Sequence, residues 1–258
     1  MKVAVCQMAT SLDVSVNAAT IGAAIEAAKR EDADLLVLPE CALSGYLPPR
    51  GLDFAALEHA EEEVAERASR AGIYLALGTT RRRDDAWLNT AVLYSPSGDV
   101  VATYDKTHLT PADRPVFEPG DALPVFAMGE WTAALQICFD MRYPENWRIL
   151  RRKGAELVMH LSNASRNAAW KVPVLEGTIR TRAAENGMFV VSANDARAPQ
   201  MMVSAICDPD GRDLARAPEN EEAMLFAKLD RSSVKADFLE ARRTDLWNRP
   251  EHRDLLLG

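Results

Sequence analysis

Apolar residues along this chain follow two spacings, which predict alternating strands and helices. Short apolar runs bounded by turn residues predict strands, and longer stretches with apolar residues three and four positions apart predict helices. The expected strands are 2–8, 34–38, 73–79, 88–94, 100–105, 131–137, 156–161, 188–193, 201–207 and 223–229. The expected helices are 17–31, with Asn17 as the capping residue, 54–71, 144–153 and 170–186, and the tail from Ser232 is expected to begin as a helix.

The order of these elements indicates a mixed sheet system. Strands and helices alternate as in an α/β fold, but the hairpin at 88–105 interrupts the rhythm, which argues against one simple doubly wound sheet. The continuous apolar run at 34–38 is typical of a strand that is covered on both faces. We expect a single domain over residues 1–258, with a C-terminal tail from about residue 241.

Composition and charge narrow the range of partners. Apolar residues make up 48% of the 258 residues, and the net charge of −8 with a pI near 5.2 argues against nucleic acid and anionic membranes as partners. The apolar N-terminal run is too short for a signal peptide and no stretch reaches the length of a membrane span, so we expect a cytoplasmic protein. Four widely spaced cysteines and four scattered histidines predict free thiols and no metal site.

The stretch 134–145, Ala-Leu-Gln-Ile-Cys-Phe-Asp-Met-Arg-Tyr-Pro-Glu, is a candidate for chemistry. An apolar run delivers Cys138 to a strand end, and Pro144 suits the first position of a following helix. Unpaired backbone N–H groups at such a junction favour a thiolate, which predicts that the Cys138 pKa lies below the ordinary value of about 8.5. The alternative is a small buried residue without a chemical role, because free cysteine is among the most buried residue types.

Two other polar residues also end apolar strands. Glu40 follows the run at 34–38 and Lys106 follows the run at 100–105. If these strands neighbour that of Cys138, a carboxylate, an ammonium and a thiol meet at one edge. Such a set can perform acyl transfer, with Glu40 moving protons and Lys106 favouring the thiolate and holding an oxyanion. Taken singly, Glu40 could be a solvated strand end and Lys106 a surface charge.

Six stretches spread over nearly the whole chain form a set of motifs. Three of them contain the residues just named: Leu36-Val37-Leu38-Pro39-Glu40 followed by Leu43-Ser44-Gly45-Tyr46, Tyr104-Asp105-Lys106-Thr107-His108-Leu109, and Ile137-Cys138-Phe139-Asp140-Met141-Arg142-Tyr143-Pro144-Glu145. The other three are Phe117-Glu118-Pro119-Gly120-Asp121, Arg182-Ala183-Ala184-Glu185-Asn186 and Asp208-Pro209-Asp210-Gly211. In their sequence and order these motifs resemble those of the nitrilase superfamily of carbon–nitrogen hydrolases.

The resemblance implies a fold and a set of roles. The fold is an αββα sandwich with mixed sheets and outer helices, in subunits that form a homodimer or a larger homo-oligomer. Glu40 matches the general-base glutamate, Lys106 the motif lysine and Cys138 the nucleophile, and no metal or organic cofactor is needed. Phe139-Asp140 after the cysteine resembles the amidase-like branches of the superfamily rather than the nitrilase or carbamoylase branches.

The chain departs from the family pattern at the second glutamate. Counting back from Gly120, Asp113 holds this place, whereas Glu118 aligns with a position that does not have the role. Aspartate is one methylene shorter, and the flanking Pro111 and Pro115 restrict the loop. We expect Asp113 to be a catalytic-site carboxylate that positions the substrate, and the alternative is a solvated loop aspartate.

Further residues near the motifs are candidates for a substrate pocket. They are Tyr46, Phe139, Arg142, Asn163 and Trp170. A core position is the alternative for Tyr46 and Trp170, because aromatic residues dominate protein cores. Arg142 could instead form a structural ion pair with Glu145.

The sequence predicts an amidase that hydrolyses a small-molecule carboxamide to a carboxylic acid and ammonia through a cysteine thioester. One alternative mechanism pairs Cys138 with His108 or His160, although a histidine at a strand end is more often structural. The alternative activities are those of an N-carbamoyl amidohydrolase or a nitrilase of the same superfamily. A non-catalytic member that acts as a binding protein is the alternative from a different class.

Overall fold

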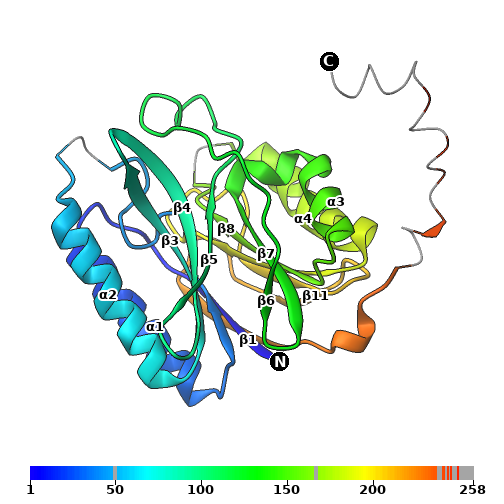
Figure 1. Ribbon diagram of the computed structural model, residues 1–258, viewed down its shortest axis with the longest axis horizontal. Coiled ribbons are helices and arrows are strands. Elements are labelled where there is room, and N and C mark those ends of the chain that lie inside the picture. Colours follow the sequence, from blue (N-terminus) through cyan, green and yellow to red (C-terminus); the bar gives the residue numbers. More distant parts are fainter. Residues whose placement is uncertain are drawn as a thin grey trace.

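Two six-stranded sheets pack face to face, and helices cover both outer faces (Figure 1). This computed structural model describes residues 1–48, 51–165 and 168–236, together with residues 240, 241, 243, 245 and 249. The arrangement is an αββα sandwich with mixed sheets, which confirms the expected fold class. The tail expected from about residue 241 lies almost entirely outside the described residues.

The first sheet has the strand order β12-β1-β2-β3-β4-β5. Its strands are β1 (Lys2–Gln7), β2 (Leu35–Val37), β3 (Tyr74–Arg83), β4 (Ala86–Tyr94), β5 (Val100–Asp105) and β12 (Ala223–Lys228). Strands β1, β2 and β3 are parallel, whereas β4 is antiparallel to both β3 and β5. Because β5 therefore runs in the direction of β2 and β3, its carboxyl end lies at the same edge of the sheet as theirs.

The second sheet has the order β11-β10-β9-β8-β7-β6. Its strands are β6 (Phe126–Met128), β7 (Trp131–Ile137), β8 (Leu157–Ser162), β9 (Phe189–Asn194), β10 (Ala205–Cys207) and β11 (Asp213–Arg216). Strands β7, β8 and β9 are parallel and form its centre. The short edge strands β6 and β11 were not predicted, and β10 begins later than expected because the N–H of Ser204 donates to Gln7 Oε1 instead of extending the ladder.

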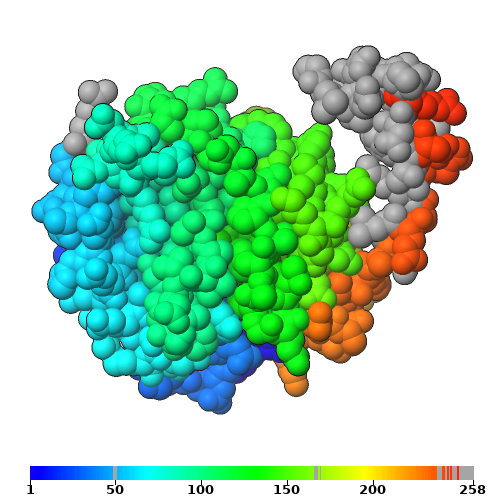
Figure 2. Space-filling model, viewed as in Figure 1, coloured from blue at the N-terminus to red at the C-terminus, as the bar shows by residue number. Residues whose placement is uncertain are grey.

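In the described part of the chain, four α-helices form the outer layers. Helices α1 (Val14–Arg30) and α2 (Phe54–Ala71) cover the first sheet, and α3 (Pro144–Arg152) and α4 (Val172–Asn186) cover the second (Figure 1). Short 3-10 turns are η1 (Cys138–Arg142), η2 (Ala169–Lys171) and η3 (Arg231–Ser233). Figure 2 shows the same face as a surface, where residues of the first sheet lie beside those of the second. None of the helices in the described ranges has the length and apolar character that a membrane crossing requires.

The expectation that Asn17 caps the first helix is wrong. Helix α1 begins before Asn17, because the carboxylate of Asp13 accepts hydrogen bonds from the backbone N–H groups of the first turn and is the N-cap. Asn17 is instead buried, and its amide donates to the carbonyls of Ser11 and Leu43. The tail expected to begin as a helix does begin with the 3-10 turn η3, followed by residues 234–236 outside any helix, and residues 237–239 lie outside the described part of the chain.

The strands alternate between two apolar layers. In β8, Leu157, Met159 and Leu161 belong to the core between the sheets, whereas Val158 packs in the layer under α3 and α4. Successive side chains of a strand point to opposite faces, so a strand with apolar partners on both sides reads as one continuous apolar run. The same alternation places His160 on the helix side of the second sheet, where its ring centroid lies 5.9 Å from that of Trp147.

Two glycines allow backbones to approach closely at the edge where β2 and β5 end. A Cβ at Gly78 in β3 would lie 2.2 Å from the carbonyl oxygen of Pro39, and a Cβ at Gly120 would lie 2.3 Å from that of Asp105. Contacts this short exclude any other side chain without a backbone shift. Gly78 therefore helps to set the position of Glu40, which directly follows Pro39. Gly120 does the same for Lys106, which directly follows Asp105.

Candidate active site

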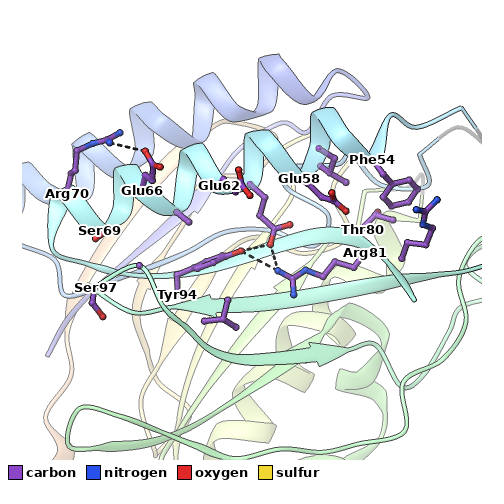
Figure 3. Close-up of a pocket in the computed structure, with 16 residues that line it drawn as sticks. Phe54, Glu58, Glu62, Glu66, Ser69, Arg70, Thr80, Arg81, Tyr94 and Ser97 are labelled. Carbon is purple, nitrogen blue, oxygen red and sulfur yellow. Dashed lines mark hydrogen bonds and ion pairs between the residues drawn. The ribbon is translucent and has the colours of Figure 1, made fainter. Parts of the chain in front are cut away.

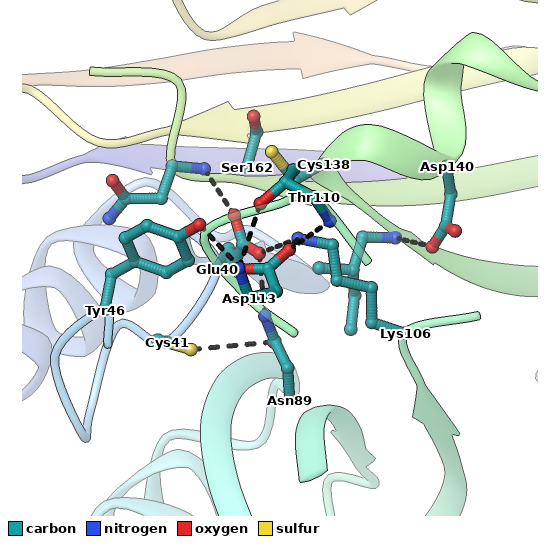
Figure 4. Close-up of polar contacts among 12 residues, drawn as sticks. Glu40, Cys41, Tyr46, Asn89, Lys106, Thr110, Asp113, Cys138, Asp140 and Ser162 are labelled. Carbon is teal, nitrogen blue, oxygen red and sulfur yellow. Dashed lines mark hydrogen bonds and ion pairs between the residues drawn. The ribbon is translucent and has the colours of Figure 1, made fainter. Parts of the chain in front are cut away.

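The residues that follow three strands meet at one edge of the sandwich (Figure 4). Glu40 lies beyond β2, Lys106 follows β5, and Cys138 follows β7. Glu40 also links the two sheets, because its N–H donates to the carbonyl of Ser162 (3.4 Å) and its Oε2 accepts from the N–H of Asn163 (2.9 Å). The meeting of strand ends that the sequence predicts is therefore present in the structure.

A buried lysine bridges two buried carboxylates. Lys106 Nζ lies 2.6 Å from Glu40 Oε1 and 2.9 Å from Asp113 Oδ2, and all three side chains are fully buried. Asn89 Nδ2 also donates to Glu40 Oε1, at 2.7 Å. Burial alone would lower the pKa of Lys106, but the neighbouring carboxylate of Glu40, with a smaller effect from Asp113, raises it well above 10.5. Lys106 is therefore an ammonium that holds both carboxylates.

Asp113 reaches Lys106 because its loop folds inward. Asp113 Oδ2 accepts the N–H of Thr110 (2.8 Å), and Asp113 Oδ1 accepts the hydroxyl of Tyr46 (2.6 Å). Burial alone would raise the pKa of Asp113, but Lys106 and these donors outweigh it and lower that pKa below 3.8. The alternative of a solvated loop aspartate is therefore wrong, whereas Glu118 is exposed.

Cys138 begins a tight turn in a left-handed backbone conformation, with a φ of +45°. The carboxylate of Asp140 holds this turn against the loop of Lys106. Asp140 Oδ2 accepts the N–H of Ile137 (3.1 Å) and the hydroxyl of Tyr104 (2.7 Å), and Asp140 Oδ1 accepts the N–H of His108 (2.9 Å). Helix α3 begins at Pro144, as predicted. Cys138 as a residue is partly exposed, whereas the other three cysteines are buried.

The expectation of a lowered Cys138 pKa is wrong for the free protein. Burial is the largest effect and raises the pKa of Cys138 to about 12, and the carboxylate of Glu40 raises it further. The Lys106 ammonium and the N–H of Asn163 act in the opposite direction but do not compensate. A thiolate loses its hydration in this setting, and that cost exceeds the attraction of nearby dipoles. The resting thiol is therefore protonated at neutral pH.

This protonation state gives the first testable prediction. Since rising pH ionises a thiol whose pKa is about 12, alkylation of Cys138 by iodoacetamide should speed up about tenfold per pH unit between about pH 7 and 10. The rate is measured by mass spectrometry of the peptide that contains Cys138, with the fully buried Cys41 as internal comparison. A rate that levels off near pH 8 would instead support the lowered pKa.

The predicted pocket residues separate into two groups. Tyr46 contacts Asp113, Phe139 directly follows Cys138, and the N–H of Asn163 contacts Glu40. Arg142 is exposed, and Trp170 is 73% exposed in η2, so the core position considered for Trp170 is wrong. A pocket role for these two stays a prediction. No ion pair between Arg142 and Glu145 is found within the described part of the chain.

Neither histidine of the alternative mechanism is directed at the thiol. His160 Nε2 lies 3.1 Å from the carbonyl oxygen of Cys138, and burial lowers the pKa of His160 to about 4. His108 Nδ1 lies 3.0 Å from Asp140 Oδ1, and its ring stacks on Tyr143 with centroids 3.6 Å apart. The geometry therefore favours the lysine-containing site over a Cys–His pair.

Three supporting residues were not predicted. Asn89 in β4 binds Glu40, Asp140 binds the Cys138 turn, and the buried Asp195 accepts Asn163 Nδ2 at 3.2 Å. Asp195 comes directly after β9. Glu40 was identified as a polar residue that follows an apolar strand. Searching the sequence for that feature would have found Asp195 too.

A hollow of about 750 Å³ lies away from this site, between α2 and strands β3 and β4 (Figure 3). There the buried carboxylate of Glu61 accepts hydrogen bonds from Arg81 and Tyr94. The hollow is lined by none of Glu40, Lys106, Asp113 and Cys138. Within the described ranges, no three His, Cys, Asp or Glu side chains are arranged so that they could hold a metal ion.

Comparisons with known proteins agree with this geometry. The family model described as "Carbon-nitrogen hydrolase" matches residues 2–237. An "(R)-stereoselective amidase" of Pseudomonas sp is 33% identical over 88% of each chain, and a "Nitrilase" of Pyrococcus abyssi is 30% identical over 80% of each chain. A solved structure of a mutant amidase from Nesterenkonia sp. AN1, with an acetamide moiety covalently added at its active-site cysteine, has a TM-score of 0.85 at 26% identity and covers 98% of this chain and 96% of its own.

Proposed function

Because this chain belongs to the carbon–nitrogen hydrolase family, we propose that it is an amidase that hydrolyses a small-molecule carboxamide to a carboxylic acid and ammonia, with Cys138 as the nucleophile. Membership in this family, with amidases among its relatives, makes it a hydrolase of carbon–nitrogen bonds other than peptide bonds. The observation that carries the assignment of residues is the Lys106 ammonium bound between Glu40 and Asp113 beside the Cys138 turn. The covalent acetamide on the cysteine of the Nesterenkonia amidase supports the same role for Cys138.

In the first half of the reaction, the protonated thiol loses its proton to Glu40 as Cys138 Sγ attacks the amide carbon. An ammonium has three protons, and Lys106 uses two of them in hydrogen bonds to Glu40 and Asp113. Its third proton and the N–H of Phe139 hold the oxyanion. Glu40 then returns its proton to the amide nitrogen, ammonia leaves, and the acyl group stays on Sγ as a thioester.

In the second half, Glu40 takes a proton from water, and the resulting hydroxide attacks the thioester carbonyl. The same two donors hold the second oxyanion. When the carbon–sulfur bond breaks, the carboxylic acid leaves and the proton on Glu40 returns to the sulfur. The buried position of Glu40, with Asn89 on one oxygen and the N–H of Asn163 on the other, keeps its carboxylate in one orientation for both halves.

Asp113 in this proposal positions Lys106 and the substrate and transfers no proton. Asp113→Ala is expected to lower kcat/KM by about 100-fold, the scale of a misplaced substrate. Asp113→Asn should be less damaging, since hydrogen bonding to Tyr46 and Lys106 survives without the charge, and Asp113→Glu should retain part of the activity. Steady-state kinetics on the best amide measures these values. An unchanged kcat/KM in Asp113→Ala would remove Asp113 from the site, and Asp121→Ala on the exposed loop is the matched control.

The proposal extends to the setting of the enzyme. We propose that residues 1–258 form one catalytic domain that acts in the cytoplasm as a homodimer or larger homo-oligomer, without a metal or organic cofactor. Exposed apolar residues on the layer of α3 and α4, including Ile149 and Val174, support a subunit contact there. Light scattering at several protein concentrations tests the assembly.

One assay tests the activity. The purified protein is incubated with a panel of aliphatic and aromatic amides, N-carbamoyl compounds and nitriles, and released ammonia is measured. Turnover of amides above the other classes supports the proposal. Preference for carbamoyl compounds or nitriles would favour the corresponding alternative, and the nitrilase among the relatives justifies including that class.

A further inference from the structure

The carbonyl of Cys138 is held by a buried histidine that the proposed mechanism does not use. His160 Nε2 lies 3.1 Å from Cys138 O, and His160 Nδ1 lies 2.9 Å from the hydroxyl of Ser192. A carbonyl oxygen can only accept, so Nε2 carries a proton. Burial lowers the pKa of His160 to about 4, so the ring is neutral and Nδ1 accepts from Ser192. The hydrogen bond from Ser192 therefore fixes the tautomer of His160 in which Nε2 carries the proton and donates to the carbonyl of Cys138.

The strand register builds this arrangement. His160 pairs with Gln136 of β7 on one side and with Ser192 of β9 on the other, so all three residues lie in one row across the second sheet. Cys138 is two residues beyond Gln136, where β7 has just ended. The imidazole lies on the helix side of the sheet, opposite to the face that packs against the first sheet.

The turn that His160 supports is a costly one. A left-handed conformation at a residue other than glycine is unfavourable, so the surroundings of Cys138 must maintain it. Side chains from three elements donate hydrogen bonds to the backbone carbonyls of the turn. His160 donates to the carbonyl of Cys138, Trp147 Nε1 donates to that of Asp140 (3.2 Å), and Arg182 Nε donates to that of Met141 (2.9 Å). Of these, only the contact of His160 acts on the peptide unit that follows Cys138.

That peptide unit contains the proposed oxyanion donor. The carbonyl of Cys138 and the N–H of Phe139 belong to one planar trans unit, so they point in opposite directions. With the carbonyl directed to the helix side, the N–H is directed towards the side of Glu40 and Lys106. We propose that His160, held by Ser192, is a positioning residue that aims the Phe139 N–H at the oxyanion of the substrate. This inference rests on the proposed amidase function.

The test compares amide turnover with alkylation of the same thiol. His160→Leu removes the donor, so kcat should fall by about 10- to 100-fold, part of the 10²–10³ that a complete oxyanion donor supplies, with KM changed less than about threefold. Ser192→Ala leaves Nδ1 without its donor and should lower kcat by about three- to tenfold. His160→Gln offers an amide N–H and should recover part of kcat. Alkylation by iodoacetamide forms a sulfur–carbon bond and expels iodide without any oxyanion, so its rate should stay within about twofold of wild type.

Two results would overturn the inference. A parallel fall of kcat and of the alkylation rate would mean that His160 only maintains the fold around Cys138. A kcat within twofold of wild type in both His160→Leu and Ser192→Ala would mean that the contact is irrelevant to turnover. If His160→Leu does not fold, Ser192→Ala and His160→Gln decide between the same results.

The exposed His59 in α2 provides the matched control His59→Leu, which should leave kcat unchanged. Failure of the proposed function shows separately, as a wild-type protein without turnover.

Discussion

Replacing Cys138 with alanine is expected to abolish amide turnover, because the proposed thioester forms on its sulfur. Cys138 is the partly exposed cysteine beside the Lys106–Glu40 pair, whereas Cys6, Cys41 and Cys207 are buried. The loss should exceed what any other single substitution in the chain produces, since covalent catalysis itself is removed. Ammonia release on the best amide measures the effect, and a thermal melt shows whether the variant is folded.

The other three thiols provide the controls for this prediction. Cys6→Ala, Cys41→Ala and Cys207→Ala should each keep most of the turnover. Cys41 is the strictest of these, because it directly follows Glu40 and its Sγ lies 3.5 Å from Asn89 Oδ1. Substantial turnover by Cys138→Ala, or its loss in Cys41→Ala with an intact fold, would contradict the assignment of the nucleophile.

The second large effect is expected at Lys106 and Glu40. Lys106→Ala should lower kcat by at least 10²–10³-fold, the usual loss for one oxyanion donor. Glu40→Gln should be as damaging, because an amide keeps the size of the side chain but carries no proton in either half of the reaction. Kinetics on the same amide measure both variants. The exposed Lys29 gives the matched control Lys29→Ala, which should leave kcat unchanged.

Stability measurements separate chemistry from folding in these variants. Lys106→Ala leaves the buried carboxylates of Glu40 and Asp113 without their cation, and breaking a buried pair typically costs about 3–5 kcal/mol. Its free energy of unfolding should therefore fall, and the combined variant with Asp113→Asn should recover part of that loss. Activity within tenfold of wild type in folded Lys106→Ala would remove Lys106 from the mechanism. An active Glu40→Gln variant with an inactive His160→Ala variant would favour the Cys–His mechanism.

Local sequence was sufficient for most elements and for the candidate groups. The limits of α2 and β7 are those predicted, since a cap or glycine and a clear apolar period define them. Elements decided by distant partners were predicted less well. Strand β10 begins late because Ser204 binds Gln7, almost two hundred residues earlier in the chain, and α1 begins early because Asp13 rather than Asn17 is free to cap it.

The sequence by itself identified Glu40, Lys106 and Cys138 as candidate groups, because each lies where an apolar strand ends and a motif surrounds it. The tertiary structure decided how these groups behave. It brings Asp113 to Lys106 by folding its loop inward, turns His160 towards the carbonyl of Cys138, and leaves Trp170 exposed. It also reverses the expected shift of the Cys138 pKa. The physical reason is that desolvation and charge interactions depend on segments far apart in the chain, and packing alone sets their distances.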